Sequence, residues 1–270
     1  MANSKLVSIV IPYFNAAKYI DDTIASVREQ SCTDWEIVIV NDGSTDLASV
    51  HALDKWKENS SIKIYHTDNT GPSSARNFAI THSRGQYILP LDADNMLYPD
   101  ALEKLLEAIA QHKTDAAYGD FTFFGAKQGL KPQQPLELKI HCVYSQADTC
   151  ALISKHVFDN GLHYDEYLNK LGLEDWEFWI HFLKTNYTAT YIPTPIFKMR
   201  VNEESRTYQV ANKNLEQIWS YVVGKHADVW RKVCNDYYYE VKMTRETPDY
   251  RIGNLLLKPY RFFKNKLFSQ

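Results

Sequence analysis

Short apolar runs alternate with amphipathic stretches over roughly the first 110 residues of the chain. Val7–Ile11 and Trp35–Val40 are rich in β-branched residues and almost continuously apolar, which is typical of strands buried on both faces. Between them, Ile20, Ile24 and Val27 repeat at helical spacing and predict a helix with one apolar stripe. Further strands are predicted at residues 62–65 and 87–91, and further helices around 50–53, from 71 and across 102–109. This alternation predicts an α/β fold with a doubly wound, mostly parallel sheet.

The second half of the chain has a different pattern. Ala116–Phe124 is predicted to be another strand, and the stretch from Gly125 to Pro135, rich in Gly, Lys, Gln and Pro, is predicted to be a loop. Apolar residues at helical spacing between Trp176 and Leu183 predict an amphipathic helix. The first turn of that helix carries Glu174 and Asp175, two acids that also suit the positive end of a helix dipole.

Two carboxylates follow the predicted strand that begins at Tyr87. The strand runs into Asp92 and Asp94, which are separated by one residue. Their side chains share a face only if the strand continues through them, whereas a turn aims both outward at the carboxyl edge, where open α/β sheets bind ligands. Paired carboxylates at such an edge suit Mg²⁺ or Mn²⁺ held against a diphosphate. On their own, two such acids are more typical of a solvated turn or a helix cap.

Polar residues at the ends of other predicted strands should converge with the acidic pair on one crevice of the sheet. These segments are Pro12–Asn15, Asn41–Ser44 and Ala75–Asn77. Their chemistry fits a pyrimidine nucleoside diphosphate: Asp42 accepts the ring N–H of uracil, Tyr13 stacks on the base, and Arg76 pairs with the base or the phosphates. Asp42 also fits a simple cap of the following helix. The glycine motifs of dinucleotide-binding folds and P-loops are absent from the sequence, which argues against those cofactors.

Length and composition narrow the class of protein. The 270 residues fit one large α/β domain with an appendage, and we expect a main domain at residues 1–205 and a C-terminal helical extension at 206–270. A net charge of −3 argues against a general nucleic-acid binder. The 4 cysteines form no Cys-x-x-Cys pair, so neither a zinc site nor a disulfide framework is indicated. Without a signal-peptide pattern or an apolar run of ~20 residues, the expected location is cytoplasmic.

Residues 250–270 have a composition of their own. Five basic residues and no acids are interleaved there with leucines and aromatic residues. Such a segment can lie at the inner face of a membrane beside anionic lipids, as in a peripheral membrane protein. Packing on its own domain or on another subunit is the alternative interpretation.

Five segments together resemble the family 2 inverting glycosyltransferases of the bacterial polysaccharide and glycan-assembly type. They span roughly residues 5 to 205 in the family's order: Val7–Asn15, Ile37–Asp46, Gly71–Asn77, Leu91–Asn95 and Glu174–Trp176. The resemblance implies the GT-A fold, with a nucleotide-binding half, an acceptor-binding half and a divalent metal, Mn²⁺ or Mg²⁺. It implies a nucleotide site lined by Pro12, Tyr13, Asn15, Asp42 and Arg76, contact of Asp92 with the ribose or the metal, a metal ligand in Asp94, and a general base in Asp175.

The same resemblance implies transfer of a sugar from a nucleotide-diphosphate donor, a UDP-sugar above all, to a hydroxyl group of a glycan or a lipid-linked acceptor. In that reaction Asp175 removes the proton of the acceptor hydroxyl, and the metal stabilises the departing diphosphate. Glu174 and Glu177 are the alternative bases. Trp176 is more typical of a core residue than of a sugar platform, and stacking on the acceptor is the alternative, because Trp176 lies next to the base in the sequence.

The chain departs from the family in one place, and two other classes of protein compete with it. Family members often carry Arg-x-His-x-x-Ser, whereas this chain has Asn202 at the histidine position, and asparagine is a poorer ligand for a divalent metal. A sugar nucleotidyltransferase needs a glycine-rich basic loop at the N-terminus, which Val7–Asn15 does not provide. A non-catalytic nucleotide-sugar-binding protein keeps the crevice but has no need of Asp175.

Overall fold

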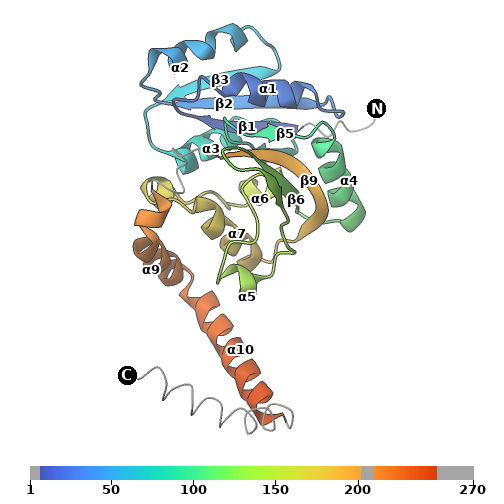
Figure 1. Cartoon of the computed structure of the whole chain (residues 1–270), viewed down its shortest axis with the longest axis vertical. Helices are drawn as coiled ribbons and strands as arrows, with labels where there is room; N and C mark the ends of the chain where they lie inside the picture. The colour runs from blue at the N-terminus through green and yellow to red at the C-terminus, as the bar shows by residue number, and fades with distance from the viewer. Residues whose placement is uncertain (1–6, 202–209, 248–270) are drawn as a thin grey trace. The chain divides into compact units, whose positions relative to one another are not determined.

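The computed structural model describes residues 7–201 and 210–247. Contacts between residues group the chain into two compact units, Met1–Val222 and Val223–Gln270. The first unit is built on one β-sheet with helices on both of its faces (Figure 1). The boundary expected between residues 205 and 206 falls outside the described residues and stays a prediction.

Within residues 7–201, a nine-stranded sheet has the order β3-β2-β1-β4-β8-β6-β9-β5, and β7 pairs with β6. Strands β1 to β4 are parallel to one another, and β6 is parallel to β9, while β8 runs antiparallel to both β4 and β6. The sheet is therefore mostly parallel, as predicted, and β8 joins its two halves. The strands are β1 (Val7–Tyr13), β2 (Trp35–Asp42), β3 (Ile62–Thr67), β4 (Tyr87–Pro90), β5 (Met96–Leu97), β6 (Ala116–Gly125), β7 (Gly129–Lys131), β8 (Leu152–Ser154) and β9 (Ala189–Val201).

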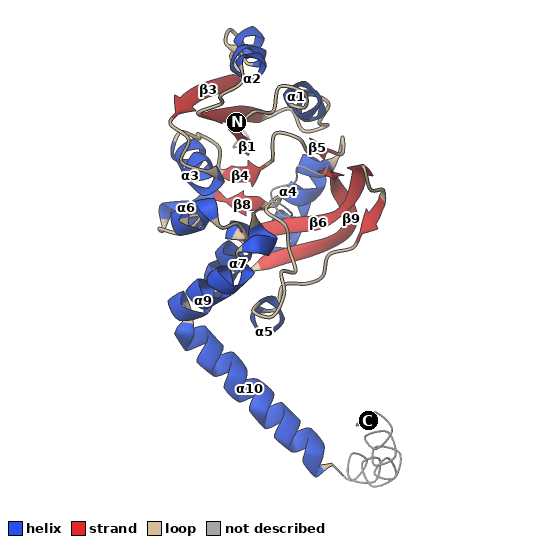
Figure 2. Cartoon of the chain, turned by 60° about the vertical axis from the view of Figure 1, so that its left-hand side comes forward, coloured by secondary structure: helices blue, strands red, loops and turns tan. Residues whose placement is uncertain are grey.

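Helices cover both faces because the central strands carry apolar side chains on both. Val7, Ile9 and Ile11 of β1 pack in one core with α1 and α4, whereas Val10 packs in a second core with α3, α6 and α7. Figure 2 shows α1 and α4 on one side of the sheet and α3 and α6 on the other, which is the doubly wound arrangement. The helices of this unit are α1 (Ile20–Arg28), α2 (Leu47–Ala52), α3 (Pro72–Thr81), α4 (Ala101–His112), α5 (Leu138–His141), α6 (Lys155–Asp159) and α7 (Glu174–Lys184). Short 3₁₀ helices are η1 (Asp54–Trp56), η2 (Glu166–Lys170) and η3 (Ala211–Lys213).

One predicted loop contains a strand. Residues of β7 pair antiparallel with Phe121–Phe123 of β6, so the loop prediction for the stretch from Gly125 to Pro135 was wrong at its centre. Gly125 and Gly129 have φ values of 89° and 124°, a conformation that glycine adopts without steric cost and that lets the chain fold back on β6. All three residues of β7 are exposed, so no buried apolar position marks this strand in the sequence.

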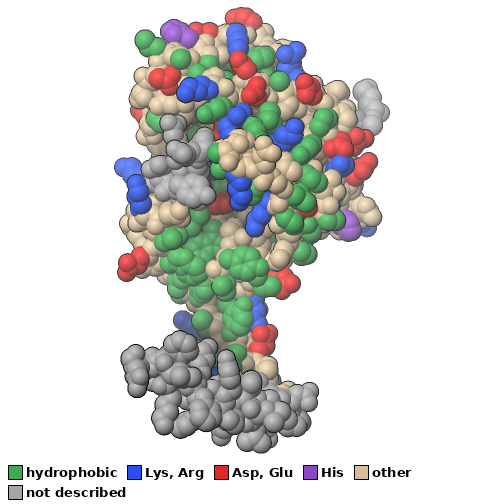
Figure 3. Space-filling model, viewed as in Figure 1, with side chains coloured by type: hydrophobic (Ala, Val, Ile, Leu, Met, Phe, Trp, Pro, Cys, Tyr) green, Lys and Arg blue, Asp and Glu red, His purple; other side chains and the backbone are tan. Residues whose placement is uncertain are grey.

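The surface of the first unit carries both acidic and basic side chains, whereas the last described helix exposes several aromatic ones. Charges of both signs are interspersed over the face of the first unit that Figure 3 shows. After α9 (Leu215–Lys225), helix α10 (Ala227–Glu246) exposes Tyr238, Tyr239 and Met243 by 61–64%. Among the residues that the structure describes, no helix has the length and apolar character needed to cross a bilayer. The basic segment at 250–270 lies outside the described residues.

Candidate active site

All residues predicted for the site line one cleft of about 740 Å³. It lies where β1, β2 and β4 end and where α3 and α7 begin. The parallel register explains this convergence, because it sets the last residue of β1, Tyr13, beside Asn41 near the end of β2. The predicted residues that line the cleft are Pro12, Tyr13, Asn15, Asp42, Arg76, Asp92, Asp94 and Asp175. The structure thus brings the predicted residues together in one cleft. What each residue can do there depends on the contacts that its side chain makes.

The acidic pair lies in a turn after β4 rather than in the strand. The strand ends at Pro90, and the backbone N–H of Asn95 donates to the Asp92 carbonyl at 3.0 Å, which closes the turn. Burial and, second, the charge of Asp92 raise the pKa of Asp94 to about 6. A bound cation relieves both effects, so the pair fits a divalent metal. The described residues contain no group of three or more metal-ligating side chains, so an ion held by this pair would need phosphate oxygens and water as its other ligands, as is usual for Mg²⁺.

Arg76 is held by two carboxylates. Its Nη2 atom lies 2.7 Å from Asp92 Oδ1, and its Nη1 atom lies 2.8 Å from Glu174 Oε1. Burial lowers the pKa of Arg76, but the two carboxylates outweigh burial and raise it. The guanidinium therefore links the acidic turn to the start of α7. Pairing with a base or with phosphates, as predicted, has to compete with these two partners.

Asp175 lies in the first turn of α7. The residue before this helix, Leu173, has a left-handed φ of 58°, and Gly172 has a φ of 95°. This uncommon backbone conformation sets the direction in which α7 leaves the cleft, and such conformations cluster at functional sites. Burial and, second, the neighbouring charge of Glu174 raise the pKa of Asp175 to about 6. The carboxylate is then still largely ionised at neutral pH and is a stronger base than an ordinary aspartate.

Of the two alternative bases, one is paired with Arg76 and the other is buried outside the cleft lining. Glu174 accepts a hydrogen bond from Arg76, and Glu177 is 0% exposed and is not part of the cleft lining. Trp176 is 2% exposed, and its Nε1–H donates to the His141 carbonyl at 2.7 Å. Trp176 is therefore a core residue, and its interpretation as a stacking platform was wrong.

Asp42 holds the loop before α3. Its Oδ1 accepts from the Thr70 N–H at 2.9 Å, and its Oδ2 accepts from the Gly71 N–H at 2.8 Å. The helix after β2 is capped instead by Asp46, which accepts from the Ser49 N–H at 2.7 Å. The interpretation of Asp42 as the cap of that helix was therefore wrong. Oδ1 also accepts from the hydroxyls of Thr70 and Thr67, at 3.3 and 3.4 Å, whereas Gly71 is the one described residue that donates to Oδ2. A further contact from the N–H of a base is therefore compatible with the remaining lone pair of Oδ2.

The aromatic residue available to a base is Phe14 rather than Tyr13. The side chain of Tyr13 is 0% exposed, and its hydroxyl donates to the Ser49 carbonyl at 2.7 Å. Phe14 is 44% exposed and lines the cleft. The prediction that Tyr13 stacks on a base is corrected for this reason, because a ring buried in the core presents no face to a ligand.

Asn15 joins the loops that follow β1 and β2. Its Oδ1 accepts from the Thr45 N–H at 2.8 Å, and its Nδ2 donates to Thr45 Oγ1 at 3.0 Å. Its own backbone N–H donates to Ser44 Oγ at 3.0 Å. Asn15 therefore fixes the loop that carries Phe14 against the loop that follows Asp42.

Asp148 and Asn169 also line the cleft, and neither was predicted from the sequence. Asp148 lies before β8, and burial and, second, the charge of Asp175 raise its pKa to about 7. Asn169 lies in η2, and its Oδ1 accepts from the Ser73 N–H at 2.8 Å, so it caps the start of α3. No motif marks either residue, because Asn169 and Ser73 are 96 positions apart and Asp148 enters the cleft from the antiparallel part of the sheet.

Arg200 lies beside the acidic turn. Its guanidinium sits between the rings of Tyr19 and Phe124, at 4.5 and 4.4 Å from their centroids, and its Nε–H donates to the Asp94 carbonyl at 3.2 Å. Asn202 lies outside the described residues, so a weaker metal site on its account stays a prediction.

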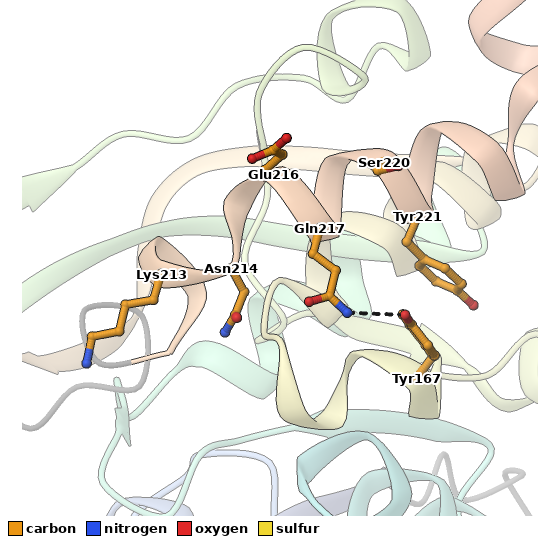
Figure 4. Close-up of a pocket in the computed structure, with 7 residues that line it drawn as sticks. All are labelled: Tyr167, Lys213, Asn214, Glu216, Gln217, Ser220 and Tyr221. Carbon is orange, nitrogen blue, oxygen red and sulfur yellow. Dashed lines mark hydrogen bonds between the residues drawn. The ribbon is translucent and has the colours of Figure 1, made fainter.

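A second hollow, of about 530 Å³, contains none of the predicted site residues. Figure 4 shows Tyr167 of η2 opposite Gln217 and Tyr221 of α9. The Tyr167 and Tyr221 rings stack with centroids 4.1 Å apart, and Gln217 Nε2 donates to the Tyr167 hydroxyl at 3.3 Å. Among the described residues that line this hollow, Glu216 is the one carboxylate, and we assign no catalytic role to it.

Comparison with known sequences gives one family and several partial relatives. Residues 8–201 match the family described as Glycosyl transferase family 2. TuaG of Bacillus subtilis, described as a putative teichuronic acid biosynthesis glycosyltransferase, is 36% identical over 144 residues, which are 52% of this chain and 55% of TuaG. The chondroitin synthase of Pasteurella multocida is 40% identical over 110 residues, which are 40% of this chain and 11% of the synthase. The chain thus spans about half or less of the length of these relatives.

Solved structures share the architecture. S. aureus TarS 1–349 in complex with UDP-GlcNAc has a TM-score of 0.63 at 19% identity, over 76% of this chain and 61% of that chain. The same TarS fragment in complex with UDP has a TM-score of 0.60 at 18% identity, over 82% of this chain and 71% of that chain. At this identity the likeness concerns the fold alone, and it confirms the predicted architecture.

Proposed function

The chain belongs to glycosyl transferase family 2, and on that premise we propose that it is a metal-dependent, inverting glycosyltransferase that moves a sugar from a UDP-sugar to a hydroxyl group of a glycan or lipid-linked acceptor. The observation that carries the proposal is the presence of Asp94 and Asp175 in one cleft. Each has a pKa raised to about 6, but their neighbours differ. Asp94 belongs to the acidic pair that suits a cation, and Asp175 stands at the start of α7 as a base.

The ends of β1 and β2 suit a uridine nucleotide. Phe14 offers an aromatic face, and Oδ2 of Asp42 has a lone pair left for the N–H of uracil. The solved TarS complexes with UDP and UDP-GlcNAc support a uridine donor for a chain of the same fold. Asp94, with Asp92, would hold Mn²⁺ or Mg²⁺, and such an ion supplies positive charge that stabilises the leaving diphosphate.

Asp175 acts on the acceptor in this proposal. The acceptor oxygen forms a bond to the anomeric carbon while the bond from that carbon to the diphosphate oxygen breaks, and the hydroxyl proton passes to the Asp175 carboxylate. Attack on the face opposite the leaving group inverts the configuration at that carbon. Arg76 holds Glu174, so the first turn of α7 stays in place next to the base.

We place the protein in the cytoplasm, with residues 250–270 against the inner face of a membrane. The support is the sequence: five basic residues among leucines and aromatic residues, and no acid. A membrane position would bring the cleft to a lipid-linked acceptor. Packing of this segment on the protein itself is the competing interpretation.

Release of UDP tests the proposal. The purified chain is incubated with UDP-GlcNAc, UDP-glucose, UDP-galactose and UDP-glucuronic acid, with Mn²⁺ or with EDTA, and UDP is measured with and without saccharide acceptors. We expect metal-dependent release from one preferred donor and faster release with an acceptor. Equal release in EDTA would overturn the metal requirement, and binding of UDP-sugars without release under any condition would indicate a non-catalytic binding protein.

A further inference from the structure

Asp148 is a carboxylate of the cleft that the proposed chemistry leaves without a role. It lines the same cleft as Asp175 and Asp92 and interacts electrostatically with both. It therefore lies near both the base and the acidic turn.

The backbone and one carboxylate oxygen of Asp148 are fixed. Its N–H donates to Gln133 Oε1 at 2.8 Å, and its carbonyl accepts from Trp179 Nε1 at 3.1 Å. Its Oδ1 accepts from the Cys150 N–H at 2.9 Å. Its Oδ2 makes no hydrogen bond to any of the described residues, so one oxygen of a firmly held carboxylate is left for a ligand.

The local turn does not explain why this residue is an acid. An asparagine accepts the same bond from Cys150 through its own Oδ1 and brings no charge. The carboxylate instead adds a negative charge near Asp175 and Asp92. Like charges in one partly buried site repel each other, which costs free energy. A ligand that donates a hydrogen bond to Oδ2 offsets this cost.

We infer that Asp148 accepts a hydrogen bond from a hydroxyl group of the donor's sugar and thereby takes part in selecting that sugar. This inference rests on the proposed function. In a UDP-sugar the sugar follows the diphosphate, and its anomeric carbon faces the acceptor oxygen that the base deprotonates. The sugar therefore occupies the space between the acidic turn and Asp175, and Asp148 lies near both. A hydroxyl group bound by a carboxylate makes a charge-assisted hydrogen bond, which is stronger than a neutral one.

The test compares the binding of UDP with that of UDP-sugars in the presence of Mn²⁺. Calorimetry on the wild type first identifies the preferred UDP-sugar. In Asp148→Asn the bond to Cys150 is retained, so we expect UDP affinity within about twofold of wild type and affinity for the preferred UDP-sugar about tenfold lower, the size of one charge-assisted hydrogen bond. Asp148→Glu keeps the charge but moves it by one methylene, and it should change the order of preference among the four UDP-sugars.

Asp115→Asn is the matched control. Asp115 also accepts from a backbone N–H, that of Thr188 at 2.8 Å, but it is not part of the cleft lining. Its substitution should change neither affinity. If Asp148→Asn weakens UDP and UDP-sugar equally, Asp148 serves the metal or the fold and the inference is wrong. If it changes neither, the inference is also wrong, whereas a wild type that binds no uridine nucleotide at all overturns the proposed function as well.

Discussion

The guanidinium of Arg76 lies 2.8 Å from the carboxylate of Glu174, a residue 98 positions further along the chain. Its other terminal nitrogen binds Asp92, so one buried cation joins α3, the acidic turn and the start of α7. The proposed metal turn and the proposed base are thereby tied to the same side chain. The position of Asp175, next to Glu174, therefore depends on contacts between segments that are far apart in the sequence.

Loss of Arg76 should destabilise the fold. Arg76 and Glu174 have side chains that are 5% and 9% exposed, so Arg76→Ala removes one partner of a buried ion pair. Breaking such a buried pair should lower the free energy of unfolding by about 3–5 kcal/mol. Urea denaturation of the variant and the wild type measures this difference. Arg84→Ala is the control, because Arg84 is 62% exposed and Glu36 retains Ser8 and Lys63 as partners. Equal losses in the two variants would contradict this role of Arg76.

Removal of Asp94 should separate metal binding from folding. In Asp94→Ala the acidic turn keeps Asp92 and its bond to Arg76, so the melting temperature of the metal-free protein should not fall. The gain in UDP affinity that Mn²⁺ gives the wild type should disappear, as measured by calorimetry with and without the ion. A variant whose UDP affinity still rises with Mn²⁺ would show that the ion is held elsewhere.

Asp175→Asn should lower turnover and leave donor binding nearly unchanged. A base is needed only when the acceptor proton leaves, so we expect a fall in kcat of ~10²–10⁴-fold. In the wild type, the rate should fall below a pH of about 6, where Asp175 becomes protonated, and this limb should be absent from the variant. Near-normal turnover would transfer the role to another group, and loss of UDP-sugar binding would assign Asp175 to the donor site.

The metal-free protein should carry an electrostatic cost that grows with pH. Asp148 has a folded-state pKa of about 7, whereas an aspartate in an unfolded chain titrates near ~3.9. The folded state therefore binds the extra proton more tightly, and this group's contribution to stability falls as pH rises from about 4 to about 7. Asp148→Asn removes the titration, so its stability relative to wild type should be higher at pH 8 than at pH 5.5 in chemical denaturation. A difference that does not change with pH would contradict this.

Residues 250–270 should decide membrane attachment. Vesicles with anionic lipids should carry the full chain upward in a flotation gradient, whereas a chain that ends at Thr247 should stay at the bottom. Neutral vesicles and high salt serve as controls, because both weaken attraction between basic residues and a lipid surface. Equal flotation of the two chains would remove the membrane from the proposed function.

The sequence by itself determined the alternation of strands and helices in the first half of the chain, the doubly wound sheet that this alternation makes, and the segments that meet at the carboxyl edge of the sheet. Apolar periodicity is a local property, so Val7–Ile11 and Ile20–Val27 could be assigned to a strand and a helix without knowledge of their partners. The position of Asp92 and Asp94 after a buried strand likewise placed them in the cleft. The hairpin strand β7 was missed because none of its residues is buried.

Only the tertiary structure decided what each side chain of the cleft contacts. Tyr13 and Phe14 are adjacent aromatic residues, and burial of one and exposure of the other depend on the helix that packs against the end of β1. Arg76 is paired with Glu174 by the packing of segments far apart in the chain, and Asp148 is brought near Asp175 by the antiparallel insertion of β8. Periodicity and spacing describe neighbours along the chain, whereas burial, ion pairs and raised pKa values arise from neighbours in space.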